Sequence, residues 1–322
     1  MKAAVSADSR RILLTLGIAL IVLICGHYAS VDIQKLNDND SADNVTEILT
    51  AFGSPDLSQD FLLRVFQLTL ESLAIGALGM VLALLIGIPL GILSARLPSL
   101  ADAPGKTPWG NGAHALLRYI CRAIMALLRS IPEIIWAFLF VRIMGLGPGP
   151  AVIAIGLTFA GIIGKLYAEL LEACDPLPIR NLRASGATWL GVLVRGALPQ
   201  VRNLWVGYGL FRFECALRSA SILGVVGAGG IGAEIDLSIR YFQFDKLATA
   251  LLAVLACIII FELLSRLLRS QKSQWSLLLL GIGAVFGSEL LDIPWVALNT
   301  DHAVHQSQAF LSSFMTPTSS TP

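Results

Sequence analysis

The stretch LAIGALGMVLALLIGIPLGILS, residues Leu73–Ser94, decides the fold class of this chain because it contains no charged residue. A helix needs roughly 20 consecutive apolar residues to cross the hydrocarbon core of a bilayer, so the stretch predicts a transmembrane helix. The whole chain has the same character, with 55% hydrophobic residues, 14% charged residues and a mean hydropathy of +0.74. Soluble proteins carry about 25% charged residues, so a soluble protein is disfavoured.

Other apolar stretches predict further spans. The first span, Ile12–Tyr28, lacks an evident signal-peptide cleavage site and is therefore expected to be retained. The remaining candidates are Ile134–Leu146, Ala151–Leu171, about 204–226 and about 247–264. His114–Leu128 is also apolar, but Arg118 and Arg122 favour an amphipathic helix at the membrane surface over a span. The predicted fold is an all-α membrane protein with a six-helix core.

The charges between the spans predict the orientation. Acidic residues dominate between the first and second spans, whereas arginine and lysine follow the second, fourth and sixth spans. Basic loops stay in the cytosol, so the amino terminus should be cytoplasmic. The predicted regions are a transmembrane helix (1–30), a periplasmic acidic loop (31–62), a core (63–270) with a cytoplasmic loop (172–200), and an extension (271–322) with a candidate span at 275–290.

The extension resembles the amino-terminal region of the same chain. Leu16-Gly17-Ile18, Val31-Asp32-Ile33 and a stretch ending at Pro55 have counterparts in Leu280-Gly281-Ile282, Leu291-Asp292-Ile293 and a stretch ending at Pro317. Two interpretations are open: the start of a second copy of the domain, or two unrelated apolar anchors of similar composition.

The most informative loop lies between the fourth and fifth spans. Pro176 and Pro178 end the preceding helix, and the leucines that follow are spaced for one face of a new helix, expected over about 178–194. Gly186 would lie in the middle of that helix, where glycine costs about 1 kcal/mol relative to alanine. We therefore expect close approach of a partner surface at Gly186.

This loop resembles the cytoplasmic loop of ABC-importer permeases, in which Glu-Ala-Ala is followed by a glycine and then by Ile-x-Leu-Pro. Gly186, Leu198 and Pro199 keep the family spacing, whereas Arg180-Asn181-Leu182 replaces Glu-Ala-Ala and Gly196 replaces the isoleucine. The resemblance implies a coupling helix that docks on a cytoplasmic ATPase. The implied coupling residues are Arg180, Arg183, Ala184, Gly186, Ala187, Leu198 and Pro199.

Other strings are similar to those of phosphonate-import permeases. They are Arg129-Ser-Ile-Pro-Glu133-Ile-Ile-Trp-Ala137, Gly145-Leu-Gly-Pro148, and segments around Lys165, Arg212 and Gly227. The resemblance implies a type I importer permease of the bacterial inner membrane that carries a phosphonate or related phosphorus oxyanion. Its implied partners are ATPase subunits, a periplasmic binding protein, a second permease subunit, alike or unlike, and membrane lipid. Nucleic acid is not expected as a partner, because the net charge is only +1.

Charged residues inside spans are costly and normally face a cavity or a partner. Lys165 and Glu169 are spaced to pair with each other, as are Glu214 and Arg218. Arg212 has no obvious partner in its own helix. The candidate residues for the pathway or gate are Glu133, Arg212, Glu214, Arg218, Gly227, Gly229, Gly230 and Gly232.

The glycine-rich string Gly227–Gly232 is not expected to bind nucleotide. No predicted strand precedes it, and the chain has no G-x-x-x-x-G-K-[ST] sequence. ATP should therefore bind to a separate subunit, and the glycines should form a tight turn or a close helix contact at the outer gate. No metal, cofactor or catalytic group is predicted, since the five cysteines and four histidines show no ligand spacing. An importer of methionine or osmoprotectant type, or an ATP-independent secondary transporter, remains as an alternative.

Overall fold

The computed structural model describes residues 7–28, 39–97 and 108–270, and every regular element among them is a helix. The chain divides into two units, Met1–Ser54 and Pro55–Pro322. In the first unit, α1 (Ala7–Tyr28) covers the predicted first span, and α3 (Asn39–Gly53) occupies part of the predicted acidic loop. The candidate span at 275–290 and the carboxy-terminal half of the internal similarity lie outside the described residues.

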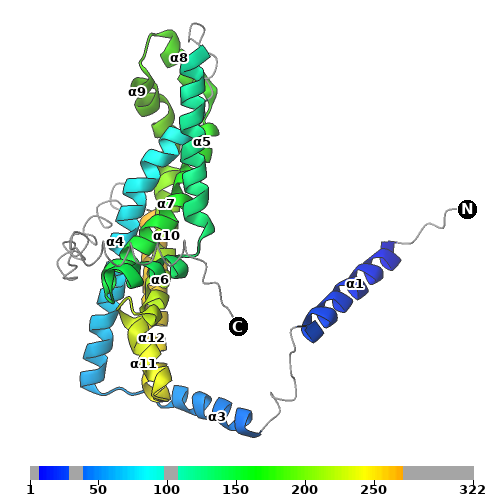
Figure 1. Cartoon of the computed structure of the whole chain (residues 1–322), viewed down its shortest axis with the longest axis vertical. Coiled ribbons are helices and arrows are strands. Elements are labelled where there is room, and N and C mark those ends of the chain that lie inside the picture. Colours follow the sequence, from blue (N-terminus) through cyan, green and yellow to red (C-terminus); the bar gives the residue numbers. More distant parts are fainter. Residues whose placement is uncertain (1–6, 29–38, 98–107, 271–322) are drawn as a thin grey trace, which may run out of the picture. The chain divides into compact units, whose positions relative to one another are not determined.

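Among the described residues of the second unit, the long helices run side by side as a bundle (Figure 1). They are α4 (Gln59–Ser94), α5 (Pro108–Ser130), α7 (Pro148–Glu172), α10 (Leu198–Leu223) and α12 (Phe244–Ser270). The short helices α8 (Pro176–Ala184) and α9 (Trp189–Val192) lie at one end of the bundle, and α11 (Ile231–Arg240) lies at the other. The remaining elements are α6 (Glu133–Met144), the π-helical turn η1 (Leu193–Ala197) and the 3₁₀ turn η2 (Gly224–Val226).

The centre of the bundle is the contact between α4 and α7. A Cβ atom placed on Gly87 would be 2.9 Å from the carbonyl oxygen of Ala160, and one on Gly91 would be 2.8 Å from that of Gly164. The two backbones therefore touch, as small residues allow between membrane helices. Apolar side chains fill the rest of this contact, with Ile75, Met80, Ile155 and Ile163 fully buried.

The helix α4 begins well before the predicted second span. It starts at Gln59 rather than Leu73, so it includes the charged residues Asp60, Arg64 and Glu71. Arg64 is tolerated there because its guanidinium binds the carboxylate of Glu234 on α11 at 2.9 Å. The predicted span therefore corresponds to the carboxy-terminal part of a longer helix, and the sequence alone did not reveal the partner of Arg64.

The predicted third span is replaced by a pair of helices with a sharp bend. The helix α6 has 12 residues, or about 18 Å of helix, which is too short to cross a bilayer of about 30 Å. It meets α5 at 87°. The longer helix α5 packs along α7 inside the bundle rather than apart from it, with Cys121 and Met125 buried.

The predicted amphipathic helix at His114–Leu128 is present as part of α5: one side packs on α7, and most of its other described residues are exposed. Its placement at the membrane surface stays a prediction. Arg122 of α5 binds the carboxylate of Glu172 at the end of α7. An arginine that pairs across the bundle can belong to a packed helix, although the sequence shows it only as a polar face.

Three helices among the described residues are long and apolar enough to cross a membrane: α4, α7 and the segment Phe244–Leu263 of α12. The pair α5 and α6, bent by 87°, and the pair of α10 and α11, bent by 43°, would each qualify as one broken span. The predicted fifth and sixth spans agree with α10 followed by η2, and with α12.

We expect Gly91→Ala to destabilise the bundle. The added methyl group would meet the backbone of Gly164, so α4 and α7 would have to separate, at a cost of about 1–3 kcal/mol for overpacking. The thermal midpoint of the detergent-solubilised protein should fall. Gly207→Ala is the matched control, because nothing lies within 4 Å of a Cβ atom at Gly207. Equal midpoints for the two variants would contradict the close contact of α4 and α7.

Candidate functional site

The segment between α7 and α10 consists of two short capped helices at one end of the bundle (Figure 1). We call residues 175–200 the coupling segment. The Asp175 carboxylate accepts a hydrogen bond from the backbone N–H of Leu177 at 3.0 Å and so caps α8. The Thr188 hydroxyl accepts one from the N–H of Gly191 at 3.3 Å and caps α9. Each helix is therefore a separate unit with its own start.

Gly186 lies in the turn that ends α8, not in the middle of a helix. Its φ is +84°, in the left-handed region that favours glycine. The N–H of Gly186 donates to the Arg183 carbonyl at 2.9 Å, and the N–H of Ala187 donates to that of Leu182 at 3.1 Å. This is the Schellman arrangement of a helix carboxyl end.

The predicted continuous helix over about 178–194 was therefore wrong. Within this chain nothing lies within 4 Å of a Cβ atom at Gly186, so the glycine is needed for its backbone conformation. Close approach of a partner surface at Gly186 stays a prediction.

The other predicted coupling residues divide into an exposed set and an anchoring set. Arg180, Ala184 and Pro199 are exposed, and Arg183 is half-buried. Ala187 and Leu198 pack against the core, beside Ile179 and Val192, which are fully buried. The segment thus has an apolar underside seated on the bundle and an outer side on which Arg180 is available to a partner.

A clamp of hydrogen bonds closes the base of the coupling segment. The Gln200 side chain accepts from the backbone N–H of Asp175 at 2.9 Å, and its amide donates to the Asp175 carbonyl at 3.4 Å. The same amide donates to the Gly196 carbonyl at 2.8 Å. Next to the clamp, the buried Cys174 thiol lies 3.7 Å from the carbonyl oxygens of Leu170 and Ala197. The end of α7 and the start of α10 are therefore tied together.

The glycine-rich string forms a turn between η2 and α11, as predicted. Gly227, Gly229 and Gly230 have positive φ values of 88°, 79° and 69°. At Gly232, a Cβ atom would be 2.1 Å from the Ser221 carbonyl oxygen, so a side chain has no room there. The N–H of Gly147 donates to the Gly227 carbonyl at 3.1 Å, which joins this turn to the one before α7.

Two residues of α4 complete this turn, and sequence analysis missed both. The Ser72 hydroxyl accepts from the N–H of Ile231 at 2.9 Å. The Glu71 carboxylate lies against Gly229, where a Cβ atom would be 2.5 Å from its Oε1. A carboxylate just ahead of an uncharged span was the available clue to Glu71; Ser72 carried none.

The predicted charged residues find separate partners. Arg212 donates to the Tyr208 hydroxyl at 2.8 Å, and its guanidinium lies 5.1 Å from the centre of that ring. The expectation that Arg212 has no partner in its own helix was therefore wrong, because an aromatic hydroxyl was overlooked. Glu133 accepts from the Ser219 hydroxyl at 2.8 Å, which links α6 to α10.

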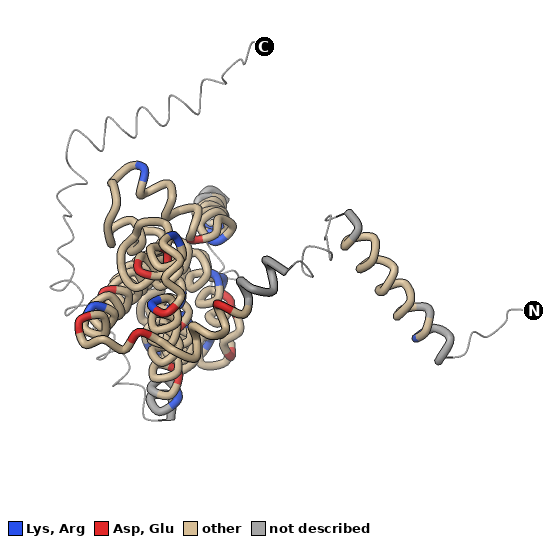
Figure 2. The backbone as a smooth tube through the Cα atoms, turned by 90° about the horizontal axis from the view of Figure 1, so that it is seen from below, with Lys and Arg blue, Asp and Glu red and all other residues tan. Residues whose placement is uncertain are grey.

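The two predicted ion pairs are present. Arg218 binds Glu214, whose side chain is nearly buried, and Lys165 Nζ lies 3.5 Å from a Glu169 oxygen. Figure 2 shows most of the bundle uncharged, with short sections of each sign. Among the described residues, no group of three or more His, Cys, Asp or Glu could hold a metal ion.

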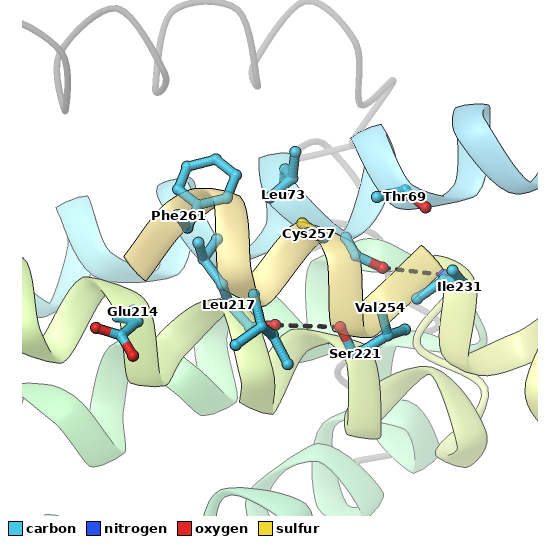
Figure 3. A pocket seen from close by; sticks show the side chains of 11 residues that line it. Thr69, Leu73, Glu214, Leu217, Ser221, Ile231, Val254, Cys257 and Phe261 are labelled. Atoms are coloured by element: carbon cyan, nitrogen blue, oxygen red, sulfur yellow. Dashed lines mark hydrogen bonds between the residues drawn. The ribbon is translucent and has the colours of Figure 1, made fainter. Parts of the chain in front are cut away.

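A small internal cavity lies between α4, α10 and α12 (Figure 3). Thr69 and Leu73 line it from α4, Glu214 and Ser221 from α10, and Cys257 from α12. Its volume of about 10 Å³ is close to the space that one water needs. Glu214 lines this cavity while Glu133 and Arg212 do not, so the predicted pathway residues do not form one site here.

A protein-family model described as the binding-protein-dependent transport system inner membrane component matches residues 87–273. The phosphite transport system permease protein PtxC of Stutzerimonas stutzeri is 33% identical over 202 residues, which are 63% of this chain and 69% of the relative. The phosphate-import permease protein PhnE of Mycolicibacterium smegmatis is 31% identical over 230 residues, or 71% of this chain and 40% of the relative.

Solved structures show the same fold. The inward-facing MetNI methionine ABC transporter matches with a TM-score of 0.55 and 22% identity, over 66% of this chain and 98% of that chain. An amino acid ABC transporter crystallised with histidines matches with a TM-score of 0.50 and 16% identity, over 66% and 99%. At this identity the likeness concerns the fold alone, and it supports the prediction of a type I importer transmembrane domain.

We expect the Cys174 thiol to react slowly with a water-soluble alkylating reagent. Burial raises the pKa of Cys174, so a smaller fraction is the reactive thiolate at a given pH. Ser185→Cys is the matched comparison, since Ser185 is exposed in the same segment. Mass spectrometry of the labelled peptides should find position 185 modified first. Equal rates at the two positions would contradict the closed base of the coupling segment.

Proposed function

This chain belongs to the family of binding-protein-dependent transport system inner membrane components, and we propose that it forms the transmembrane pathway for a phosphonate, phosphite or related phosphorus oxyanion. It is a permease subunit of an ABC importer. The observation that carries the energy-coupling part of the proposal is the coupling segment, two short helices joined at Gly186 on one end of the bundle.

The proposed role of the coupling segment is to dock on a separate ATPase subunit. Its apolar underside includes the fully buried Ile179 and Val192, whereas Arg180 and Ala184 are exposed. The family's Glu-Ala-Ala is replaced here by Arg180-Asn181-Leu182. The exposed start of the segment is therefore basic, and we expect it to meet an acidic surface on the ATPase, which binds and hydrolyses the ATP.

The clamp of hydrogen bonds supports a proposed path by which movement of the ATPase is transmitted to the helix bundle. Because Gln200 joins the base of the segment to Asp175, a displacement of the segment moves the ends of α7 and α10 together. The helix α10 continues to the glycine turn at the far end of the bundle, where the proposed outer gate lies. Closure of an ATPase pair would thus reach Gly227, Gly229, Gly230 and Gly232.

Two features favour a phosphorus oxyanion as the substrate. The relatives named above are a phosphite permease and a phosphate-import permease. The helix α10 carries Arg202, Arg212 and Arg218 against the single carboxylate of Glu214. Guanidinium groups bind tetrahedral oxyanions through paired hydrogen bonds, so this excess suits a phosphonate group.

The proposed assembly has two permease subunits, alike or unlike, with two ATPase subunits on one side and a substrate-binding protein on the other. The basic residues Arg96, Arg180 and Arg183 lie at the end of the bundle that holds the coupling segment. The positive-inside rule supports the proposal that this end is cytoplasmic, and the predicted cytoplasmic amino terminus belongs to the same proposal.

We expect Gly186→Val to abolish uptake while the protein still inserts in the membrane. A β-branched residue at φ +84° costs about 1–2 kcal/mol or more, so the turn should open and the docking surface should change shape. Radiolabelled substrate uptake and retention of the ATPase on the purified chain should both fall at least tenfold.

Gly191→Ala is the control for this variant. It lies in the same segment, and its added methyl group would meet the Thr188 hydroxyl at 3.5 Å and the Ala187 methyl at 3.7 Å, both ordinary contacts. Normal uptake is expected from Gly191→Ala. Normal uptake from Gly186→Val would refute the coupling role of the turn.

We also expect uptake to require ATP and to favour phosphorus oxyanions. Proteoliposomes containing this chain, its ATPase and its binding protein should accumulate phosphite or methylphosphonate, whereas those with this chain alone should not. Uptake by the chain alone would favour a secondary transporter. ATP-dependent uptake of methionine but not of phosphorus compounds would favour an importer of another solute.

A further inference from the structure

A second and much larger cavity lies between α5 and α7, close to the coupling segment. Its volume is about 280 Å³, against about 10–15 Å³ for one water. The residues of α5 that line it are spaced by three and four, as are those of α7, so each helix presents one face. The lining consists of Ser94, Arg122, Met125, Ala126, Arg129, Lys165, Ala168, Glu169 and Glu172.

The lining of this cavity, which opens to solvent, favours a polar occupant. Empty cavities in proteins are lined by apolar side chains, but five of the nine lining residues here are ionisable. Three of them are cationic and two are anionic, so the cavity has a net charge of +1 if all are ionised. A small anion is the occupant that this balance favours.

The two carboxylates in the lining do not neutralise all three cationic side chains. Glu172 receives the backbone N–H of Arg96 at 2.8 Å and the guanidinium of Arg122. Arg122 also donates to the Ser94 carbonyl at 3.4 Å. These bonds join the ends of α4, α5 and α7, and they occupy both Glu172 and Arg122 in holding the helices together.

Arg129 and Lys165 remain available to a ligand. Lys165 Nζ is 3.5 Å from Glu169, beyond the usual length of a charge-assisted hydrogen bond of about 2.7–2.9 Å. The Arg129 side chain makes no hydrogen bond or ion pair with any residue that the structure describes. Its backbone is held against α7, because a Cβ atom on Gly161 would be 2.9 Å from the Arg129 nitrogen. The backbone that carries the Arg129 guanidinium is therefore held in place at the edge of the cavity.

We propose that this cavity binds a tetrahedral phosphorus oxyanion through Arg129 and Lys165. A planar guanidinium binds two oxygens of such a group, and an ammonium binds a third as a compact charge. The inference rests on the proposed function in one respect, since the transported compound is one source of the tetrahedral oxyanion. The phosphate of an anionic lipid head group supplies it too.

A site of this kind must bind weakly. Both cationic side chains are exposed to solvent, so their attraction for an anion is screened. Weak binding suits a group that pauses in transit, because tight binding would prevent release. The neighbouring ion pair of Arg122 and Glu172 adjoins the end of α7, so a bound anion would lie next to the helix that leads into the coupling segment.

The test is binding of inorganic phosphate and of methylphosphonate to the full chain, purified in detergent without lipid and followed by ³¹P NMR line broadening. Removal of one charge-assisted contact should weaken binding about tenfold. We expect this loss in Arg129→Gln and in Lys165→Gln, and partial recovery in Arg129→Lys. Arg118→Gln is the matched control, because Arg118 is on the same helix but does not line the cavity.

A second arm distinguishes the source of the oxyanion. The same variants are reconstituted in nanodiscs of phosphatidylcholine with phosphatidylglycerol, and the lipids that remain bound after extraction are measured by native mass spectrometry. Loss of phosphatidylglycerol from Arg129→Gln, with no binding of the free anions to any form, assigns the cavity to a lipid head group. Equal binding of both ligand types by wild type, Arg129→Gln and Lys165→Gln, with unchanged thermal midpoints, overturns the proposal.

Failure of this inference differs from failure of the proposed function. ATP-dependent uptake of phosphite that is unchanged in Arg129→Gln, together with unchanged anion and lipid binding, removes the cavity site and leaves the importer intact. Absence of ATP-dependent uptake from the wild-type assembly removes the importer function, while the binding measurements on the isolated chain still decide whether the cavity takes an oxyanion.

Discussion

The direct contact of the α4 and α7 backbones is the constraint on which the rest of the structure depends. Glycines on both helices leave no room for a side chain between Gly91 and Gly164. In a bilayer, lipid tails are as apolar as leucine, so packing rather than the hydrophobic effect must hold helices together. Close contact of two long helices provides that packing. It fixes α7 as the central helix, and α5, α6 and α10 all pack against it.

Some of the charged residues in the bundle join one helix to another. Arg122 and Glu172 link α5 to α7, Arg64 and Glu234 link α4 to α11, and Glu133 with Ser219 links α6 to α10. Each pair satisfies groups that would be costly to leave alone in a membrane. Arg129 differs, because it belongs to the same face as Arg122 but has no such partner among the described residues. This difference, more than the number of charges, separates a structural role from a binding role.

The sequence predicted the features that depend on composition and local chemistry. The apolar stretches located α7 and α12 well, and the glycine string at Gly227 correctly predicted a tight turn. Prediction from the sequence was incomplete where a residue depends on a partner far away in the chain. The sequence did not show that α4 extends back to Gln59, where Arg64 binds Glu234, 170 residues away. It also did not show that α5 packs along α7, where Arg122 binds Glu172. At Gly186 the residue was identified but not its backbone conformation, since φ is invisible in a sequence.

The clamp at the base of the coupling segment is built from uncharged groups. Gln200 uses only its amide, and Asp175 contributes only its backbone N–H and carbonyl to that clamp. Such bonds do not titrate in the physiological range, and dissolved ions screen them far less than they screen exposed charges. Ionic strength should therefore alter the proposed contact of the basic outer side of the segment with an ATPase, while leaving the hydrogen-bonded connection between α7 and α10 unchanged. A change in the salt content of the cell would thus change the affinity of the proposed ATPase contact without weakening the hydrogen bonds between Gln200 and Asp175.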